Sequence, residues 1–254
     1  YIHIPFCRQK CFYCDFPSFA GREKKIDRYL QALKQEFALL RQRLYPKDNV
    51  KDTESKFAPR TIYIGGGTPT ALNAHQMKTL LKFVQKYVAV AEAEEFTVEM
   101  NPGTVDREKL LLLQQAGINR LSVGVQSFDD HCLQKIGRIH TAQDAVNTIE
   151  LAHNLGFDNI SLDLIYGLPQ QDREILTKSV ERALTLPVQH ISIYGLQLEE
   201  GTAFQRMADM GKLQLPTDEL VETMHDYIVE KLPEAGYQRY EISNYALPGY
   251  ESKH

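Results

Sequence analysis

Short apolar segments alternate along the chain with longer segments in which apolar residues recur every three to four positions. The short segments are rich in β-branched residues and most end in Gly or Pro, so they predict strands. The longer segments predict amphipathic helices. We expect strands over residues 1–6, 61–67, 96–102, 120–127, 159–169 and 190–198. We expect helices over about residues 25–45, 73–91, 106–116, 141–155, 172–184 and 217–232.

The ends of several expected helices carry capping residues. Side chains that can accept hydrogen bonds from the first backbone N–H groups precede four of them, at Asn73, Asp106, Thr141 and Thr217. Gly117 and Gly156 stand where two helices would end. The repeated order of strand and helix predicts parallel strands joined by right-handed crossovers in one continuous domain. Residues 46–60 lack apolar periodicity and are expected to form a surface loop.

Apolar and polar residues alternate within the expected strands. In strand 120–127, Leu121, Val123 and Val125 alternate with polar or small residues, and strands 96–102, 159–169 and 190–198 follow the same pattern. Period-two geometry places one set beneath the helices and turns the other toward a shared interior. Strands covered on both faces would be apolar throughout. We therefore expect an α/β fold, a partial (βα)6 TIM-like barrel with parallel strands and a polar lumen, in preference to a doubly wound sheet.

Three polar side chains of the lumen face lie toward the C-terminal ends of their strands, namely Glu99, Gln126 and Asp163. Taken singly, each suits a residue that caps a loop. Barrel enzymes place their chemistry at this end of the strands. The three side chains together therefore predict a functional site at the barrel mouth.

Composition and charge narrow the class of protein. The 254 residues are 43% hydrophobic and 24% charged, as in an ordinary globular domain. The net charge is -4 and the charges are interspersed, so nucleic acid is not an expected partner. No apolar run approaches the roughly 18 to 20 residues that span a bilayer. We expect no transmembrane segment and a cytoplasmic location, with which peripheral association with a membrane is compatible.

Three of the four cysteines, Cys7, Cys11 and Cys14, fall within the segment CRQKCFYCDF. Such clustering indicates metal or redox chemistry rather than a disulfide scaffold. A structural zinc site needs a fourth ligand, for which His3 is the nearest candidate. A [4Fe-4S] cluster held by three cysteines instead leaves one iron open for a substrate or cofactor. The residues alone leave both alternatives open. Cys132 stands apart and is expected to be a small buried hydrophobe.

The spacing C-x3-C-x2-C after the first strand of a βα barrel resembles the radical S-adenosylmethionine (SAM) superfamily, over essentially the whole chain. The resemblance implies that Cys7, Cys11 and Cys14 bind a [4Fe-4S] cluster. It also implies that the methionine moiety of SAM chelates the open iron and that SAM is cleaved reductively to a 5'-deoxyadenosyl radical. The segment GGGTPT, residues 65–70, is similar to the glycine-rich element of that family near the SAM amino group.

Further segments, EMNPGT, GVQSF, GRIHTA and LDLIYGLP, resemble the branch that contains oxygen-independent coproporphyrinogen III dehydrogenase and the HemW-type haem chaperones. Arg138 offers a fork for a carboxylate, although the sequence equally suits a solvated surface charge at this position. By the resemblance, the residues in contact with SAM would be Tyr1, Tyr13, Gly66, Gly67, Thr68, Glu99, Gln126, Arg138 and Asp163.

Two features favour the chaperone group within that branch. The dehydrogenase carries a further cysteine two positions after the third, where this chain has Phe16. The last residues resemble the approach to the haem-binding motif HNxxYW, of which His254 would be the first residue and, by analogy, a haem ligand. The chain starts at Tyr1 without Met, so we expect residues 1–254 to be a core domain truncated at both ends. A C-terminal haem- or substrate-associated domain is expected after His254.

The leading hypothesis is therefore a haem chaperone that binds a [4Fe-4S] cluster and SAM and delivers haem to target haemoproteins. Its implied partners are haem or a porphyrin, haem-acceptor proteins and an electron donor. The first alternative is a dehydrogenase that oxidatively decarboxylates propionate side chains of coproporphyrinogen III. The second is a zinc-stabilised, non-catalytic barrel. The resemblance implies that SAM can be cleaved, and no residue is assigned a catalytic role.

Overall fold

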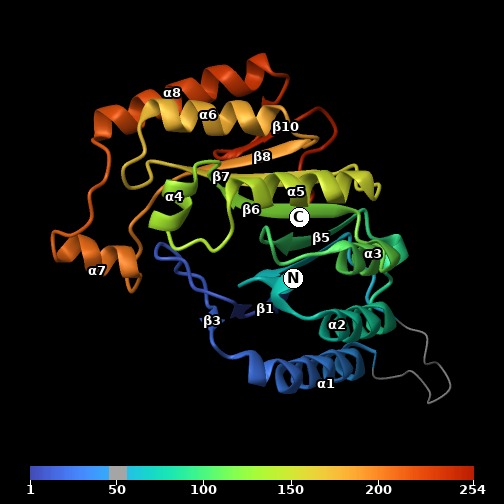
Figure 1. The fold of residues 1–254 in the computed structure, drawn as a ribbon. Coiled ribbons are helices and arrows are strands. Elements are labelled where there is room, and N and C mark those ends of the chain that lie inside the picture. Colours follow the sequence, from blue (N-terminus) through green and yellow to red (C-terminus); the bar gives the residue numbers. More distant parts are fainter. Residues whose placement is uncertain (46–55) are drawn as a thin grey trace.

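The structure of the protein is a computed structural model that describes residues 1–45 and 56–254. Within these residues, six strands pair in parallel in the order β1-β4-β5-β6-β7-β8. They are β1 (Ile2–Ile4), β4 (Thr61–Gly66), β5 (Glu95–Met100), β6 (Arg120–Gln126), β7 (Ile160–Tyr166) and β8 (His190–Gly195). The strands form a curved sheet, so the predicted partial α/β barrel is confirmed (Figure 1).

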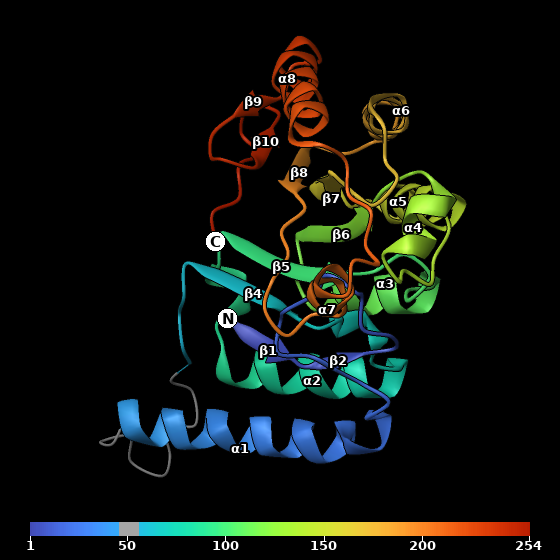
Figure 2. The same ribbon diagram turned by 90° about the vertical axis from the view of Figure 1, so that its left-hand side faces the viewer.

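Helices cover the convex face of this sheet, and both termini lie on the opposite, open side (Figure 2). The expected helices are all present: α1 (Ile26–Leu44), α2 (Ala74–Tyr87), α3 (Arg107–Gln115), α5 (Ala142–Asn154), α6 (Arg173–Leu184) and α8 (Asp218–Glu234). The four predicted N-caps accept hydrogen bonds from the backbone N–H group three residues later. Gly117 and Gly156 have φ of 89° and 91°, which suits glycine at a helix C-terminus.

The predicted alternation along the strands separates the core from the lumen. Leu121, Val123 and Val125 are fully buried in the hydrophobic core between the sheet and the helices. The intervening Ser122, Gly124 and Gln126 line the cavity inside the barrel. The lumen is therefore polar because β6 and its neighbours turn their second face toward it.

Several elements were not expected from the sequence. The short helices α4 (Asp130–Lys135) and α7 (Ala203–Asp209) lie in loops at the mouth, and β2 (Phe6–Cys7) pairs with β3 (Phe19–Ala20). A hairpin of β9 (Gln238–Arg239) and β10 (Asn244–Ala246) joins the edge of β8 in antiparallel orientation. The six expected strands are parallel, as predicted, and this added hairpin was not recognised because a three-residue strand carries too little pattern.

Most of the predicted loop 46–60 falls outside the described residues. Its last part packs on the helical layer, since Phe57 forms a β-bridge with Val88 and contacts the ring of Phe37 on α1. None of the helices formed by residues 1–45 and 56–254 is long and apolar enough to cross a membrane.

Candidate cofactor-binding site

A cavity of about 820 Å³ runs through the lumen from the mouth, at the C-terminal ends of the strands, to their N-terminal ends. Its volume is in the range of clefts that bind small molecules and cofactors. Eight predicted site residues line its upper part, namely Cys7, Cys11, Cys14, Tyr13, Gly67, Thr68, Gln126 and Arg138. Residues from the cysteine loop, from the strands and, at the opposite end, from the C-terminal segment line this one cavity.

The cysteine loop is held in place by backbone contacts at both ends. Cys7 lies in β2, which pairs with β3. The backbone N–H of Phe12 donates to the carbonyl of Ile136 at 3.0 Å, and that of Cys14 donates to the carbonyl of Cys11 at 3.2 Å. Cys7 is buried, and Cys11 and Cys14 are half-buried at the cavity wall. The loop therefore presents all three thiols to one space.

The three thiols fit the donor set of an iron-sulfur cluster. Burial raises the pKa of the Cys14 thiol, and the nearby Cys11 and Cys7 raise it further, against the backbone hydrogen bond at Phe16 that lowers it. The thiols are thus close enough to repel one another when ionised, which bound iron would offset. No group of three or more His, Cys, Asp and Glu side chains among the described residues surrounds a position suited to one metal ion. A [4Fe-4S] cube takes each thiolate on a different iron, so its ligands need not meet at one point.

A chain of polar contacts connects two of these cysteines across the barrel mouth. The Thr68 hydroxyl donates to Cys7 Sγ at 3.6 Å and accepts from Asn101 Nδ2 at 2.8 Å. Asn101 Oδ1 in turn accepts from Arg138 Nη2 at 2.8 Å, and Arg138 Nη1 donates to Cys11 Sγ at 3.5 Å. Arg138 also donates to the carbonyl of Gly124. The interpretation of Arg138 as a solvated surface charge is therefore wrong, because its guanidinium faces the thiols.

Residues 65–67 have to be glycine, because other protein atoms lie within 3 Å of where a Cβ atom would stand. A Cβ on Gly65 would lie 2.9 Å from the Glu99 carboxyl, and one on Gly66 would lie 2.6 Å from the His3 ring. A Cβ on Gly67 would lie 2.8 Å from the carbonyl oxygen of Phe6 and 2.9 Å from Cys7 Sγ. The segment thus lets β4 pack directly against the cysteine loop and Glu99.

Two carboxyl groups face the lumen below the cysteine loop. Glu99 accepts from the Tyr63 hydroxyl at 2.7 Å and from the backbone N–H of Gly66 at 2.9 Å. Burial nevertheless raises the pKa of Glu99 above its ordinary value. Burial and repulsion from Glu99 raise the pKa of Asp163 to about 7, and Arg120 opposes that rise. Close carboxyl groups in a desolvated lumen resist simultaneous ionisation.

Gln126 ends β6 in a left-handed backbone conformation, with φ of 70°. The register of β6 against β7 shifts at this point, between Gly124 and Gln126. A residue other than glycine adopts this conformation at a cost of roughly 1 to 3 kcal/mol, and such conformations cluster at functional sites. The bulge turns Gln126 toward the cavity, as its expected contact with SAM requires.

Tyr1 and His254 also line the cavity, and Tyr13 lies in its upper part. Tyr1, which is 66% exposed, and half-buried Tyr13 line its wall. His254 lies at the N-terminal ends of the strands, where its ring stacks on Tyr63 with centroids 4.7 Å apart. Both ring nitrogens of His3 have partners, the Tyr1 hydroxyl at 3.0 Å and the carbonyl of Pro17 at 2.9 Å.

Sequence reasoning did not single out Tyr63, Asn101 or Arg120, which are polar residues that line the cavity. Arg120 and Tyr63 stand at positions of the alternating pattern that face the lumen, so the pattern contained the signal. Asn101 follows β5 within the segment EMNPGT, where its position after a strand end was the available indication. Cys132 is fully buried, as expected.

Comparison with known proteins gives consistent results. The sequence profile described as the Radical SAM superfamily matches residues 1–183. The whole chain is 42% identical to the haem chaperone HemW of Bacillus subtilis (strain 168), of which it covers 65%. It is 40% identical to HemW of Escherichia coli (strain K12), of which it covers 64%. The chain thus spans slightly less than two thirds of these curated relatives.

A solved structure extends the similarity to the fold. The coproporphyrinogen III oxidase HemN from Escherichia coli, described as a radical SAM enzyme, superposes with a TM-score of 0.83 at 28% identity. The match covers 98% of this chain and 55% of that one. The family profile accounts for most of the chain, including the cysteine loop and β1 to β7. The chain therefore belongs to the radical SAM superfamily.

Proposed function

We propose that this chain is the core of a haem chaperone that uses a [4Fe-4S] cluster and SAM and delivers haem to target haemoproteins. Superfamily membership implies these two cofactors. The observation that carries the proposal is the identity of 42% and 40%, over all of this chain, to proteins named haem chaperone HemW. Phe16, at the position where the dehydrogenase carries a further cysteine, supports the same choice.

In this proposal Cys7, Cys11 and Cys14 would hold the cluster, which would supply the electron for reductive cleavage of SAM. The chain from Thr68 to Arg138 orients two of the thiols and keeps the guanidinium beside them. SAM contacts the residues that line the cavity around the cluster, namely Tyr1, Tyr13, Gly66, Gly67, Thr68, Glu99, Gln126, Arg138 and Asp163. His254 is proposed as a haem ligand.

The test uses the full-length protein, reconstituted with iron and sulfide without oxygen. We expect about four irons per chain, a change of the cluster's EPR signal on addition of SAM, and binding of haem followed by optical absorption. Zinc without iron or sulfide would reject the proposal and support the zinc-stabilised barrel. A reconstituted protein that binds SAM but no haem would reject the chaperone role alone.

A second candidate is the oxidative decarboxylation of coproporphyrinogen III. The structural similarity to HemN, with a TM-score of 0.83, favours it. Incubation of the reconstituted protein with coproporphyrinogen III, SAM and a reductant distinguishes the two functions. Formation of vinyl product would overturn the chaperone proposal, and we expect none.

We further propose that the partners are haem-acceptor proteins and an electron donor, and that the protein works in the cytoplasm. The four cysteines are free thiols and three of them share one wall of the cavity, a usage typical of a reducing compartment.

A further inference from the structure

The lower lumen, which we define as the cavity wall formed by Arg120, His190, Tyr240, Ser252 and His254, contains a buried cation. The described residues give it no hydrogen bond or ion pair, and its interaction with a carboxylate is the electrostatic one with Asp163. Arg120 is the first residue of β6, and its side chain lines the cavity although it is only 3% exposed. Its Nε has no hydrogen-bond partner. Within the part of the chain that the structure describes, Arg120 forms neither a hydrogen bond nor an ion pair.

The polar groups around Arg120 are occupied by one another. His190 Nδ1 shares a hydrogen bond with the Ser161 hydroxyl, and Nε2 shares one with the Tyr240 hydroxyl, both at 2.8 Å. Burial and the nearby Arg120 lower the pKa of His190 to about 3, so this ring is neutral. His190 therefore has no free ring nitrogen to accept a hydrogen bond from the Arg120 guanidinium.

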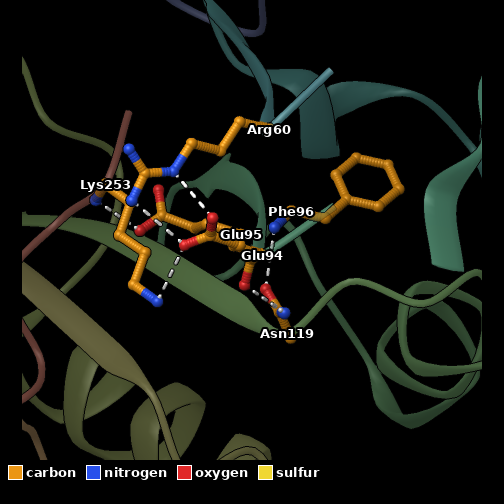
Figure 3. A network of polar contacts seen from close by, with 6 residues as sticks. All are labelled: Arg60, Glu94, Glu95, Phe96, Asn119 and Lys253. Carbon is orange, nitrogen blue, oxygen red and sulfur yellow. Dashed lines mark hydrogen bonds and ion pairs between the residues drawn. The ribbon is translucent and has the colours of Figure 1, made fainter. Parts of the chain in front are cut away.

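The acidic residues at this end of the barrel are also engaged (Figure 3). Glu94 pairs with Arg60 at 2.7 Å and with Lys253 Nζ at 3.3 Å. Glu95 accepts from the backbone N–H of Lys253 at 2.8 Å. It also accepts from the Ser252 hydroxyl at 3.3 Å. Glu94 thus has two cationic partners and Glu95 accepts hydrogen bonds from the C-terminal segment, and among the described residues neither carboxylate forms an ion pair with Arg120.

A guanidinium in this setting is suited to a carboxylate. Its planar fork matches the two oxygens of a carboxylate, and it stays charged at any working pH. A buried charge without a partner is unfavourable unless a counter-ion is bound. We propose that Arg120 binds a carboxylate group of a ligand that reaches the lower lumen. The His190, Tyr240 and Tyr63 rings near Arg120 provide flat surfaces for an unsaturated part of such a ligand.

Two ligands of the proposed function carry carboxylates, namely SAM and a haem or porphyrin with propionate arms. The choice between them rests on that function, whereas the carboxylate site rests on Arg120 alone. The experiment compares wild type and Arg120→Gln as full-length, cluster-loaded proteins. The ligands are SAM, haem, and haem whose two propionates are converted to methyl esters. Arg60→Gln removes the same charge from an exposed arginine and serves as the control.

We expect Arg120→Gln to weaken the binding of SAM or of haem by about tenfold or more, as for loss of a hydrogen-bonded charge pair. If haem supplies the carboxylate, the ester binds wild type as weakly as haem binds the variant. If SAM supplies it, SAM affinity falls and both haem forms are unaffected. Unchanged affinities for all three ligands would overturn the proposal. Loss of SAM affinity in a protein that never binds haem would support the carboxylate site and reject the chaperone role.

A stability measurement separates ligand binding from a structural role. Because the guanidinium is buried and has no hydrogen bond or ion pair to the described residues, Arg120→Gln and Arg120→Met should melt at the same temperature as wild type or higher. A structural ion pair would predict the opposite. If both variants melt several degrees lower and lose affinity for every ligand equally, Arg120 supports folding and the proposal is wrong.

Discussion

The most informative single substitution is Asp163→Asn, because it keeps the shape of a lumen side chain and removes its ionisation. Asp163 lies on β7 between Gly124 and Ser192 of the neighbouring strands. Burial and repulsion from Glu99 raise its pKa from 3.8 to about 7 in the folded protein. In the unfolded chain, the carboxyl ionises near its ordinary value.

The sign of the effect follows from proton linkage. Between about pH 4 and about pH 7 the unfolded state loses the proton first, so the wild type is destabilised as pH rises and stays so above pH 7. The difference of about three in pKa corresponds to at most about 4 kcal/mol. Asp163 is half-buried, and solvent screening reduces this value, so we expect Asp163→Asn to be more stable by about 2 kcal/mol at pH 8. The gain should shrink toward zero as pH falls to about 4.

The assay is urea unfolding of the apo protein at several values from about pH 5 to about pH 8.5, with Asp158→Asn as the control. Asp158 is exposed and lies just before β7, so its substitution should leave the pH dependence unchanged. A gain of about 2 kcal/mol corresponds to roughly 4 to 8 °C in Tm for a domain of this size. The reasoning is refuted if Asp163→Asn is less stable than wild type at pH 8, since the carboxylate would then be ionised and paired in the fold.

Three further substitutions test the cysteine loop, the glycine-rich segment and the lumen below them. Cys7→Ala should abolish the cluster, measured by bound iron and sulfide, whereas Cys132→Ala, in a separate apolar cluster, should retain it. Gly67→Ala should also prevent cluster assembly, because the added Cβ would meet Phe6 and Cys7 within 3 Å. Gly201→Ala, with φ of 81° and no atom within 4 Å, should cost about 1 kcal/mol of stability and leave iron content normal. Tyr63→Phe removes the 2.7 Å hydrogen bond to Glu99 and should lower the free energy of unfolding by about 1 kcal/mol; an unchanged value would show that water replaces the hydroxyl.

The strands, the main helices and the identity of the lumen face followed from the sequence because each depends on a local pattern. Alternation in strand 120–127 separates core from lumen whatever the strand pairs with. Caps such as Asn73 and Thr141 act on the N–H groups three residues away, so their effect is readable along the chain. The three clustered cysteines likewise predicted metal or redox chemistry before any fold was known.

Which side chains contact one another could not be predicted, because the contacting residues lie far apart in the sequence and no local pattern relates them. The contacts from Thr68 through Asn101 to Arg138 join residues that are 33 and 37 positions apart. Helices α4 and α7 and strand β10 are too short to show a period. The partial barrel brings β4, β5, β6 and the C-terminal segment around one cavity, and this closure leaves Arg120 buried without a hydrogen bond or ion pair to any described residue. Periodicity tells which face a side chain takes, and only packing in three dimensions tells what it meets there.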